Sequence, residues 1–341
     1  MDIEAKIRAM PKVELHRHLS GAVSSEAMYD IARKLGLSLE EEDREAFLIL
    51  TSMYRTDKGF HHFLEKFRPR ARYYKDRRLV SEVTRSVIQD AARDNIIYLE
   101  LRFSASHFSR EMGFDREEIS EQIISIAREE AQAADMKVGF LMTLTRDLTI
   151  EENCALMDIA LHSRLAEYFV GIDIAGDEDT IPLSKLEICI KETIEHGKRL
   201  TIHAGEAGPA ANVSEAIDAG ALRIGHGVHS FHDMAIVNTA RDRGVCYEVC
   251  PTSNIDTMTI NGVAELEISR LLQERIALTI NTDDPGISTT TLSDELIIIQ
   301  RTFDLTIEDL IQLQRNGISA AFLDEETKTE LHGRLDGFAA A

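Results

Sequence analysis

The sequence lacks long apolar runs, paired cysteines and an excess of positive charge. No window approaches the roughly 18 consecutive apolar residues that a membrane span needs, and the N-terminal segment has no continuous apolar core of a signal peptide. The cysteines form no C-x-x-C pair, and each lies in an apolar setting that suits a buried free thiol: Cys154, Cys189, Cys246 and Cys250. We therefore expect a soluble cytoplasmic protein.

Positive charge is scarce relative to negative charge. Lys and Arg number 38 against 59 Asp and Glu, which leaves a formal net charge of -21. Nucleic acid would be repelled at long range, whereas a small neutral substrate would hardly be affected. The 44% apolar and 28% charged residues are ordinary for a compact soluble protein and argue against a disordered chain.

Apolar stretches with strand character alternate with helical patterns along most of the chain. Eight strands are predicted, over residues 12–16, 96–102, 137–143, 169–174, 199–203, 221–226, 245–250 and 275–282. Strands that alternate with helices through short turns are parallel, and eight of them can close a TIM (β/α)8 barrel. The charged helical region 39–94 predicts extra helices inserted between strands 1 and 2. We expect one domain over residues 1–341, with a doubly wound open sheet as the alternative fold.

Polar residues recur where the predicted strands end. In chain order they are His16, His18, Asp173, Gly176, His203, Glu206, His226, Asp283 and Asp284. A closed ring brings all these strand ends to one mouth, which favours the barrel over the open sheet. Any single histidine here could be structural, but three imidazoles and one carboxylate together make a plausible zinc set with a position left for water.

The other polar residues at the strand ends suit a hydrolytic reaction. A zinc-bound water has its pKa lowered to roughly 7 and supplies hydroxide at neutral pH. Glu206, close to His203 in the sequence, is placed to pass a proton to the substrate, and His226 could orient the water. Asp284 could face the substrate or simply serve the favoured turn sequence Asp-Asp-Pro-Gly.

Six short motifs extend over nearly the whole chain. They are PKVELHRHLSG at 11–21, GIDIAGDE at 171–178, HAGE at 203–206, GHG at 225–227, EVCPTSN at 248–254 and NTDDP at 281–285. In this order they resemble the motifs of the adenosine/adenine deaminase family of the amidohydrolase superfamily. The tail segment NGISAAFL at 316–323 is similar as well.

The resemblance implies that hydroxide, activated by one zinc ion per chain, adds to C6 of a 6-aminopurine to give the 6-oxopurine and ammonia. Four residues match the family's metal ligands: His16, His18, His203 and Asp283. Glu206 would protonate N1 and His226 would assist the hydroxide. Asp284 would contact N7, and the N–H of Gly176 would reach N3. This assignment agrees with the chemistry above, because N1 protonation makes C6 electrophilic.

Position 20 departs from the family pattern. Adenosine deaminases usually carry Asp there and adenine deaminases Glu, whereas this chain has Ser20. In the family this position helps to recognise the substituent on N9, so Ser20 is expected to contact the substrate. His18 is also expected to contact it. We predict deamination of adenosine or 2′-deoxyadenosine to inosine and ammonia. The alternative substrates are adenine, a modified adenosine or an N6-substituted AMP.

Aromatic residues recur at helical spacing in the predicted insertion. Core packing is the simplest interpretation of this stripe. Three of its members also match a helix that caps the pocket in the family, so we expect them to form part of a lid: Phe63, Leu64 and Phe67.

Other classes of protein fit the sequence less well. Zinc deaminases that act on cytosine or tRNA adenine use H-x-E with P-C-x-x-C, and Cys250-Pro251 is followed by no second cysteine in that spacing. Two-metal barrel hydrolases normally carry a bridging Lys after the fourth strand, where this chain has Asp173. A binding protein that has lost catalysis would be expected to lose a ligand or Glu206. The sequence carries no signal for a particular oligomeric state.

Overall fold

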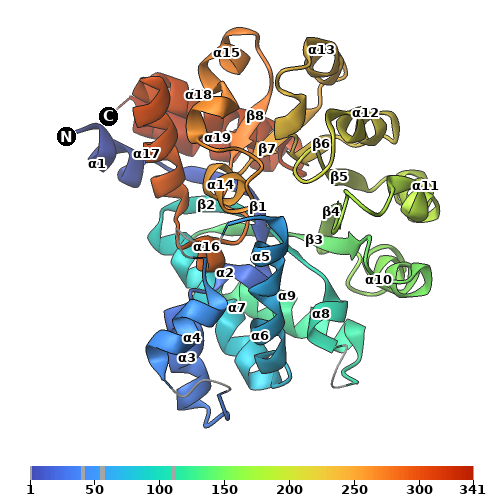
Figure 1. The fold of residues 1–341 in the computed structure, drawn as a ribbon. Helices are drawn as coiled ribbons and strands as arrows, with labels where there is room; N and C mark the ends of the chain where they lie inside the picture. The colour runs from blue at the N-terminus through green and yellow to red at the C-terminus, as the bar shows by residue number, and fades with distance from the viewer. Residues whose placement is uncertain (1, 40–42, 54–57, 110–112, 341) are drawn as a thin grey trace.

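The computed structural model describes residues 2–39, 43–53, 58–109 and 113–340. Eight parallel strands follow one another around a central barrel in chain order (Figure 1). The strands are β1 (Lys12–His18), β2 (Ile96–Phe103), β3 (Lys137–Thr145), β4 (Phe169–Ala175), β5 (Arg199–Ala204), β6 (Arg223–His226), β7 (Cys246–Val249) and β8 (Leu278–Ile280).

Backbone hydrogen bonds between the carboxyl ends of β1 and β8 close the barrel. The N–H of His18 donates to the carbonyl of Asp283 (2.9 Å), and the N–H of Asp283 donates to the carbonyl of His16 (3.0 Å). Arg17 and Asp283 form an isolated parallel bridge at the same place. An open sheet would leave both edge strands unpaired, so these bonds confirm the predicted TIM barrel and exclude the doubly wound alternative.

Helices surround the barrel, and α2 to α7 lie between β1 and β2, where the sequence predicts an insertion (Figure 1). None of the helices in the described ranges combines the length and apolarity needed to cross a bilayer. The helices are α1 (Ile3–Ala9), α2 (Leu19–Ala22), α3 (Ser25–Lys34), α4 (Arg44–Thr51), α5 (Phe60–Glu65), α6 (Phe67–Tyr73), α7 (Arg77–Arg93), α8 (Ala105–Ser109), α9 (Arg116–Ala133), α10 (Ile150–His162), α11 (Glu187–Glu195), α12 (Ala210–Asp218), α13 (Met234–Asp242), α14 (Pro251–Asp256), α15 (Ile268–Gln273), α16 (Pro285–Ser288), α17 (Leu292–Phe303), α18 (Ile307–Ala320) and α19 (Glu325–Ala339), with 3-10 turns η1 (Leu183–Leu186), η2 (Val228–Ser230) and η3 (Val263–Leu266).

Local sequence explains why these helices form where they do. In α7, Val80, Val83 and Val87 recur at helical spacing and are fully buried, so one face of the helix packs into the core. Helix α10 begins at a capping box, in which the side chains of Thr149 and Glu152 each accept a hydrogen bond from the other's backbone N–H. Such a cap contributes about 1 kcal/mol by satisfying N–H groups that have no partner within the helix.

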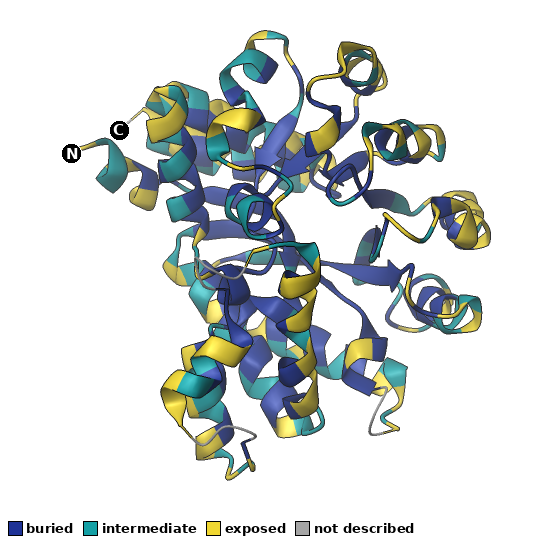
Figure 2. Cartoon of the chain, viewed as in Figure 1, coloured by how far each residue is buried: buried dark blue, intermediate teal, exposed yellow. Residues whose placement is uncertain are grey.

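The strands are buried, whereas the outer faces of the surrounding helices are exposed (Figure 2). Apolar side chains fill the space between strands and helices in one large hydrophobic cluster. Within the sheet, by contrast, β2, β6 and β7 contribute charged side chains that are almost completely buried: Glu100, Arg102, Arg223 and Glu248. Buried charges require partners, and these four residues pair with one another in the floor beneath the pocket described below.

Two of the predicted site residues have a left-handed backbone conformation. The φ angle is 60° at His226, the last residue of β6, and 64° at Asp283, which lies just beyond β8. This conformation is unfavourable for residues other than glycine and persists only where the surrounding structure holds it. Such strain concentrates at functional sites, so these two strand ends indicate a functional site at the mouth of the barrel.

Candidate active site

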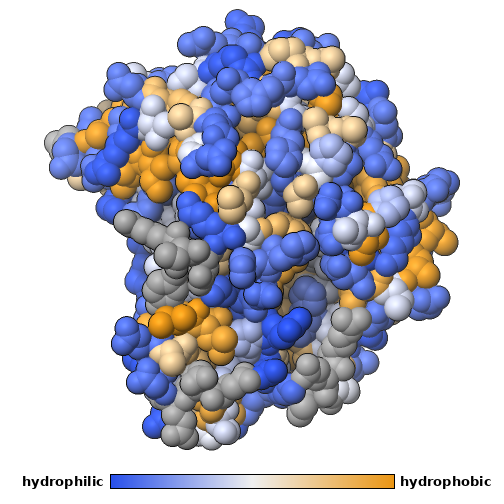
Figure 3. All heavy atoms as spheres, viewed as in Figure 1, coloured by the Kyte–Doolittle hydropathy of each residue, from blue (hydrophilic) through white to orange (hydrophobic). Residues whose placement is uncertain are grey.

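A pocket of about 400 Å³ lies at the carboxyl ends of the strands. Residues at the ends of several strands line it, including Thr145 of β3, Ala175 of β4 and His226 of β6. Every site residue predicted from the sequence lines this pocket except His16, which is fully buried behind it. On the face shown in Figure 3, hydrophilic residues predominate where Figure 1 places α5 and α6, whereas a hydrophobic patch lies where it places α4.

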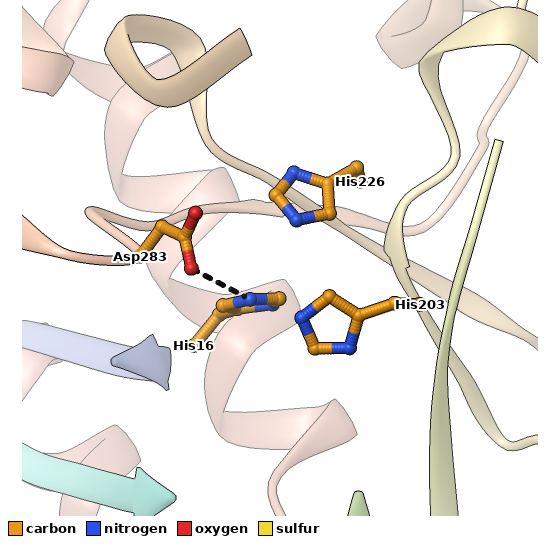
Figure 4. Close-up of side chains that lie close together, drawn as sticks. All are labelled: His16, His203, His226 and Asp283. Atoms are coloured by element: carbon orange, nitrogen blue, oxygen red, sulfur yellow. Dashed lines mark ion pairs between the residues drawn. The ribbon is translucent and has the colours of Figure 1, made fainter. Parts of the chain in front are cut away.

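Imidazole and carboxylate groups converge at the floor of the pocket. His16, His203, His226 and Asp283 each offer a ligand atom within 4.8 Å of the others, and their side chains point toward one another (Figure 4). Nε2 of His16 lies 3.2 Å from Oδ1 of Asp283. His18 lies at the edge of this group, because its Nε2 is 3.3 Å from Nε2 of His203 and 3.4 Å from Oδ1 of Asp283.

Acceptors behind two of the histidines hold their lone pairs toward the pocket. Nδ1 of His16 lies 2.8 Å from Oε2 of Glu248, and Nδ1 of His203 lies 3.0 Å from Oδ1 of Asp173. Since both partners are acceptors, the proton of each neutral ring lies on Nδ1 and the lone pair lies on Nε2. Acceptors placed behind histidine rings in this way orient histidine ligands on a metal. Nε2 of His16 is buried and has no hydrogen-bond partner among the described residues, which fits a ligand to a cation.

Arg102 connects the two acceptors. It donates to Oδ1 of Asp173 (3.1 Å) and to Oε2 of Glu248 (2.9 Å) from the centre of the barrel. Burial alone would raise the pKa of Glu248, but Arg102 and Arg223 outweigh it and hold that pKa well below its usual range. Burial would raise the pKa of Asp173 as well, but Arg102 also outweighs it there, so both carboxyls are available as acceptors for His16 and His203.

The proton of His226 lies on the other ring nitrogen, Nε2, than in His16 and His203. With the side-chain amide oriented as in the structure, Nδ2 of Asn254 lies 3.1 Å from Nδ1 of His226 and donates to it. The proton of the neutral ring then lies on Nε2, which is 3.5 Å from Oε2 of Glu206. Burial lowers the pKa of His226 well below its usual value, so the ring is neutral. A nitrogen that carries a proton cannot bind a metal, so this arrangement suits a hydrogen-bond donor.

The two consecutive aspartates have different environments. Oδ2 of Asp283 accepts a hydrogen bond from the hydroxyl of Ser253 (2.7 Å), which leaves Oδ1 facing the histidines. Oδ1 of Asp284 is buried without a hydrogen-bond partner among the described residues. A Cβ atom at Gly21 would lie 1.9 Å from that same oxygen, so only glycine leaves room for Asp284 there. Burial raises the pKa of Asp284 well above its usual value, and the charge of Asp283 raises it further.

Glu206 is held at the pocket by its backbone. Glu178 accepts hydrogen bonds from three successive N–H groups, those of Gly205 (2.9 Å), Glu206 (2.6 Å) and Ala207 (2.9 Å). This clamp fixes the turn after β5, where Gly205 has a φ angle of 72°. Burial raises the pKa of the Glu206 carboxyl well above its usual value, and the charges of Asp283 and Glu178 raise it further. The carboxyl therefore keeps its proton to a higher pH than an ordinary glutamate does and can act as an acid.

Gly176 lies at the wall of the pocket just after β4. Its φ angle is 94°, and a Cβ atom there would lie 2.6 Å from Oδ2 of Asp147. Glycine therefore lets the backbone approach the pocket closely, as the sequence predicts for a substrate contact. Arg146 supports this wall, because its guanidinium donates to the carbonyls of His203 (3.0 Å) and Gly176 (3.4 Å).

The predicted lid residues line the pocket and also pack together. Phe63 is buried, its ring centroid is 5.8 Å from that of Phe67, and both rings contact a small cluster that includes Ile287. Leu64 is 41% exposed. Ser20 is half-buried in the pocket wall, and its carbonyl accepts a hydrogen bond from the hydroxyl of Tyr74 (2.7 Å). The aromatic stripe thus packs locally and lines the pocket at the same time, and its role as a lid stays a prediction.

Several residues around the site were given no role in the sequence analysis. All of them have a charged or polar side chain that is buried in the structure. In the sequence they lie within an apolar stretch or within one of the six motifs: Arg102, Asp173, Glu178, Glu248, Ser253 and Asn254. A charged residue inside an apolar strand, such as Glu248 between Tyr247 and Val249, is a signal in itself, because such residues are rarely buried without a partner. The sequence cannot name that partner.

The chain is similar to proteins of known activity over almost its whole length. A family model described as adenosine deaminase matches residues 11–338. An adenosine deaminase of Clostridium perfringens (strain SM101 / Type A) is 30% identical over 323 residues, which cover 94% of this chain and 97% of the relative. The solved N6-methyl-AMP deaminase of Arabidopsis thaliana has 25% identity and a TM-score of 0.84 over 98% of both chains. An adenine deaminase of Arthrobacter aurescens shows the same fold, with 22% identity and a TM-score of 0.89 over 97% of this chain and 100% of that one.

A barrel that gathers histidine and aspartate side chains at the carboxyl ends of its strands has the arrangement of a TIM-barrel enzyme. The comparisons specify which class of enzyme it is. The chain belongs to the adenosine deaminase family, within the amidohydrolase superfamily, and is an aminohydrolase. The resemblance in the sequence motifs is thereby confirmed.

Proposed function

We propose that the pocket catalyses hydrolytic deamination of a 6-aminopurine nucleoside, adenosine or 2′-deoxyadenosine, to the 6-oxopurine and ammonia. The observation that carries this proposal is the convergence, in one pocket, of the buried His/Asp cluster and the Glu206 carboxyl, whose pKa is raised by burial. Such groups can supply the metal ligands and the acid that the reaction needs. The intact set also argues against a protein that binds purines without turning them over.

His16, His18, His203 and Asp283 are the proposed ligands of one zinc ion. Three observations support this set: Nε2 of His16 makes no hydrogen bond among the described residues, it faces Oδ1 of Asp283, and acceptors lie behind His16 and His203. The protonated Nε2 of His226 supports leaving His226 out of it. A bound zinc ion would supply Lewis acidity, which lowers the pKa of a water molecule to roughly 7.

The remaining side chains bind and protonate the purine. Glu206 donates its proton to N1, which withdraws electrons from C6 and makes that carbon electrophilic. His226 donates a hydrogen bond from Nε2 and orients the attacking water. Asp284, whose buried Oδ1 has no other described partner, binds N7 as a protonated carboxyl, and the backbone N–H of Gly176 binds N3.

A nucleoside 5′-monophosphate is the second candidate substrate. Arg68, Lys75 and His107 line the same pocket in a chain whose overall charge is strongly negative. Ser20 is neutral where the family carries a carboxylate, so it would not repel a phosphate. The similarity to an enzyme named N6-methyl-AMP deaminase supports this candidate. Adenine is less well matched, because these three side chains would have no part of a free base to contact.

The whole chain is proposed to act as one domain in the cytoplasm. The main hydrophobic cluster takes residues from Ile7 near the N-terminus to Leu335 near the C-terminus, which supports a single folding unit. The four cysteines are free, which supports a reducing compartment.

The test is a panel of purified-enzyme assays that follow the absorbance of the 6-amino group and the release of ammonia. The substrates are adenosine, 2′-deoxyadenosine, adenine, AMP and N6-methyl-AMP, which releases methylamine instead of ammonia. We expect about one tightly bound zinc per chain and turnover of at least one nucleoside or nucleotide. Absence of turnover on the whole panel by the zinc-loaded protein would overturn the proposal.

A further inference from the structure

A second cluster of metal-ligating side chains lies on the outside of the barrel, between α10 and α11. It contains His162, the last residue of α10, and two residues one helical turn apart, Glu192 in α11 and His196 at its C-terminal cap. Each offers a ligand atom within 4.8 Å of the others. None of them lines the pocket, and the proposed deamination uses none of them.

The distances within the cluster approach those of a metal site. Nε2 of His162 lies 3.3 Å from Oε1 of Glu192, and the two imidazole rings lie 4.6 Å apart at 80°. Ligand atoms around a tetrahedral zinc ion, at bonds of about 2.0–2.1 Å, are roughly 3.3 Å from one another. His162 and Glu192 already have this spacing, so only the exposed ring of His196 has to adjust.

The backbone prepares one of the rings. Nδ1 of His196 lies 2.8 Å from the carbonyl oxygen of Glu192, one turn back in the helix, and donates its proton there. The neutral ring then has its lone pair on Nε2, which is the tautomer that binds a metal. Among the described residues, the only ion-pair partner of Glu192 is His162, so its carboxylate is not taken up by a lysine or arginine.

The two helices also pack closely enough to hold the cluster together. Cys154 of α10 lies about two helical turns before His162, and Cys189 of α11 lies about two turns before His196. The two cysteine side chains interact. Burial raises the pKa of Cys189 to about 12, and the neighbouring Cys154 is the second-largest cause of this rise. Because the turns match, the faces that meet at the cysteines are the faces that carry the histidines. The ligands are therefore brought together by the packing of α10 on α11.

We propose that His162, Glu192 and His196 form a second divalent-metal site, which binds zinc and clips α10 to α11. Two imidazoles and one carboxylate are a ligand set that zinc accepts, with a remaining position for water. The high negative charge of the chain attracts cations to its surface. Binding to the folded state alone stabilises the protein, so this site serves structure and not catalysis.

A simple ion pair is the competing explanation, and the chain contains a matched example. His232 lies 3.7 Å from Glu267 through Nδ1 and Oε2, and its side chain is 67% exposed. No second imidazole accompanies this pair among the clusters found in the described ranges. His232→Ala therefore removes an exposed histidine and its pair with a glutamate without removing a three-ligand cluster.

The experiment measures zinc bound per chain by equilibrium dialysis of the zinc-loaded enzyme over a range of free Zn²⁺. The proteins are wild type, His162→Ala, His196→Ala and the control His232→Ala. Wild type and control are expected to take up one zinc beyond the tightly held one, whereas both cluster variants lose that additional zinc. Added zinc should also raise the Tm of wild type and control but not of the cluster variants.

Equal uptake by wild type and His162→Ala would overturn the proposal, as would an equal loss in the His232→Ala control. The substitutions are on exposed side chains, and an unchanged circular dichroism spectrum with a cooperative unfolding transition shows that each variant is folded. The result is a difference between wild type and variant, so it holds however many ions the barrel pocket binds. Failure of this site and failure of the proposed deamination are therefore separate outcomes.

Discussion

The pKa values of buried carboxyl groups shift in opposite directions in the floor of the barrel, beneath the pocket, and at the mouth of the barrel, where the pocket lies. In the floor, Glu248 lies between Arg102 and Arg223, which hold its pKa well below the usual range although burial alone would raise it. At the mouth, Glu206 is close to no arginine or lysine among its described ion-pair partners, and burial raises its pKa well above the usual value. The pKa of the same residue type is therefore lowered at one depth and raised at the other.

This difference separates structural from catalytic charge. A carboxylate between two guanidinium groups is a permanent acceptor, and Glu248 uses that charge to orient His16. A protonated carboxyl that faces a pocket holds a proton that it can transfer. The buried polar atoms that make no hydrogen bond among the described residues likewise include Nε2 of His16 and Oδ1 of Asp284, which face the proposed metal and substrate positions.

The largest effect is expected from Glu206→Gln. The amide cannot donate an acidic proton to N1, so turnover should fall by about 10²–10⁴, the usual contribution of a general acid. Stability and zinc content should be almost unchanged, because the amide resembles the protonated carboxyl. The measurements are kcat, zinc per chain and urea unfolding, with the exposed Glu215→Gln as control. Full activity in Glu206→Gln would remove the acid role.

The same substitution in the floor should act on stability. Glu248→Gln leaves Arg102 and Arg223 without their shared negative charge, and breaking a buried pair in this way costs roughly 3–5 kcal/mol. It also weakens the acceptor behind His16, so zinc affinity should fall by about 10–100-fold. Urea unfolding and zinc competition measure the two effects.

The exposed Glu121→Gln is the control for that experiment, since its pair with Arg164 lies at the surface. Surface pairs contribute at most about 1 kcal/mol. Equal losses of stability in Glu248→Gln and Glu121→Gln would contradict the distinction between floor and surface charge.

Glu295 lies outside the pocket and tests whether burial alone, with no positively charged neighbour among the described residues, raises the pKa of a carboxyl group. It is fully buried in α17, and burial raises its pKa to about 7 from the model-peptide value of 4.5. The folded state therefore binds more protons than the unfolded state between these two values, so the free energy of unfolding falls as pH rises through them. The loss should reach about 3 kcal/mol, since each pKa unit corresponds to about 1.4 kcal/mol.

Glu295→Gln carries no titratable group and should lack this part of the pH dependence. The measurement is the difference in unfolding free energy between wild type and Glu295→Gln from pH 4 to pH 8. A difference that stays constant with pH would show that Glu295 is ionised in the folded protein, and that burial alone does not explain the raised pKa values.

The smallest effect is expected at the outer end of the pocket. Ser20→Asp adds a negative charge near the cationic lining, so kcat/KM for AMP should fall by about 10-fold relative to adenosine, as for the loss of roughly 1.4 kcal/mol of charge interaction. Ser24→Asp is the control: it adds the same charge outside the pocket and keeps a residue type that caps α3. An unchanged ratio of AMP to adenosine would mean that position 20 does not read this part of the substrate.

Much of the fold could be predicted from the sequence because its signals are local. Apolar stretches such as Ile96–Phe103 mark strands, and the polar residues that follow them mark strand ends whatever the rest of the chain does. The boundaries were less accurate. The last strand was predicted over residues 275–282, whereas β8 covers only Leu278–Ile280, because hydrogen bonds with β7 decide how much of an apolar stretch becomes strand.

The sequence by itself determined the barrel class, the family and the identity of the side chains that gather at the mouth, because motifs and strand ends can be read along the chain. Only the tertiary structure decided the protonation and orientation of those side chains. Arg102 and Glu248 form a hydrogen bond although they are 146 residues apart in the sequence. Glu178 accepts a hydrogen bond from the N–H of Glu206, which lies 28 residues further along the chain. A pKa and a tautomer depend on which charges and acceptors lie within a few ångströms, and the folded barrel alone sets those distances.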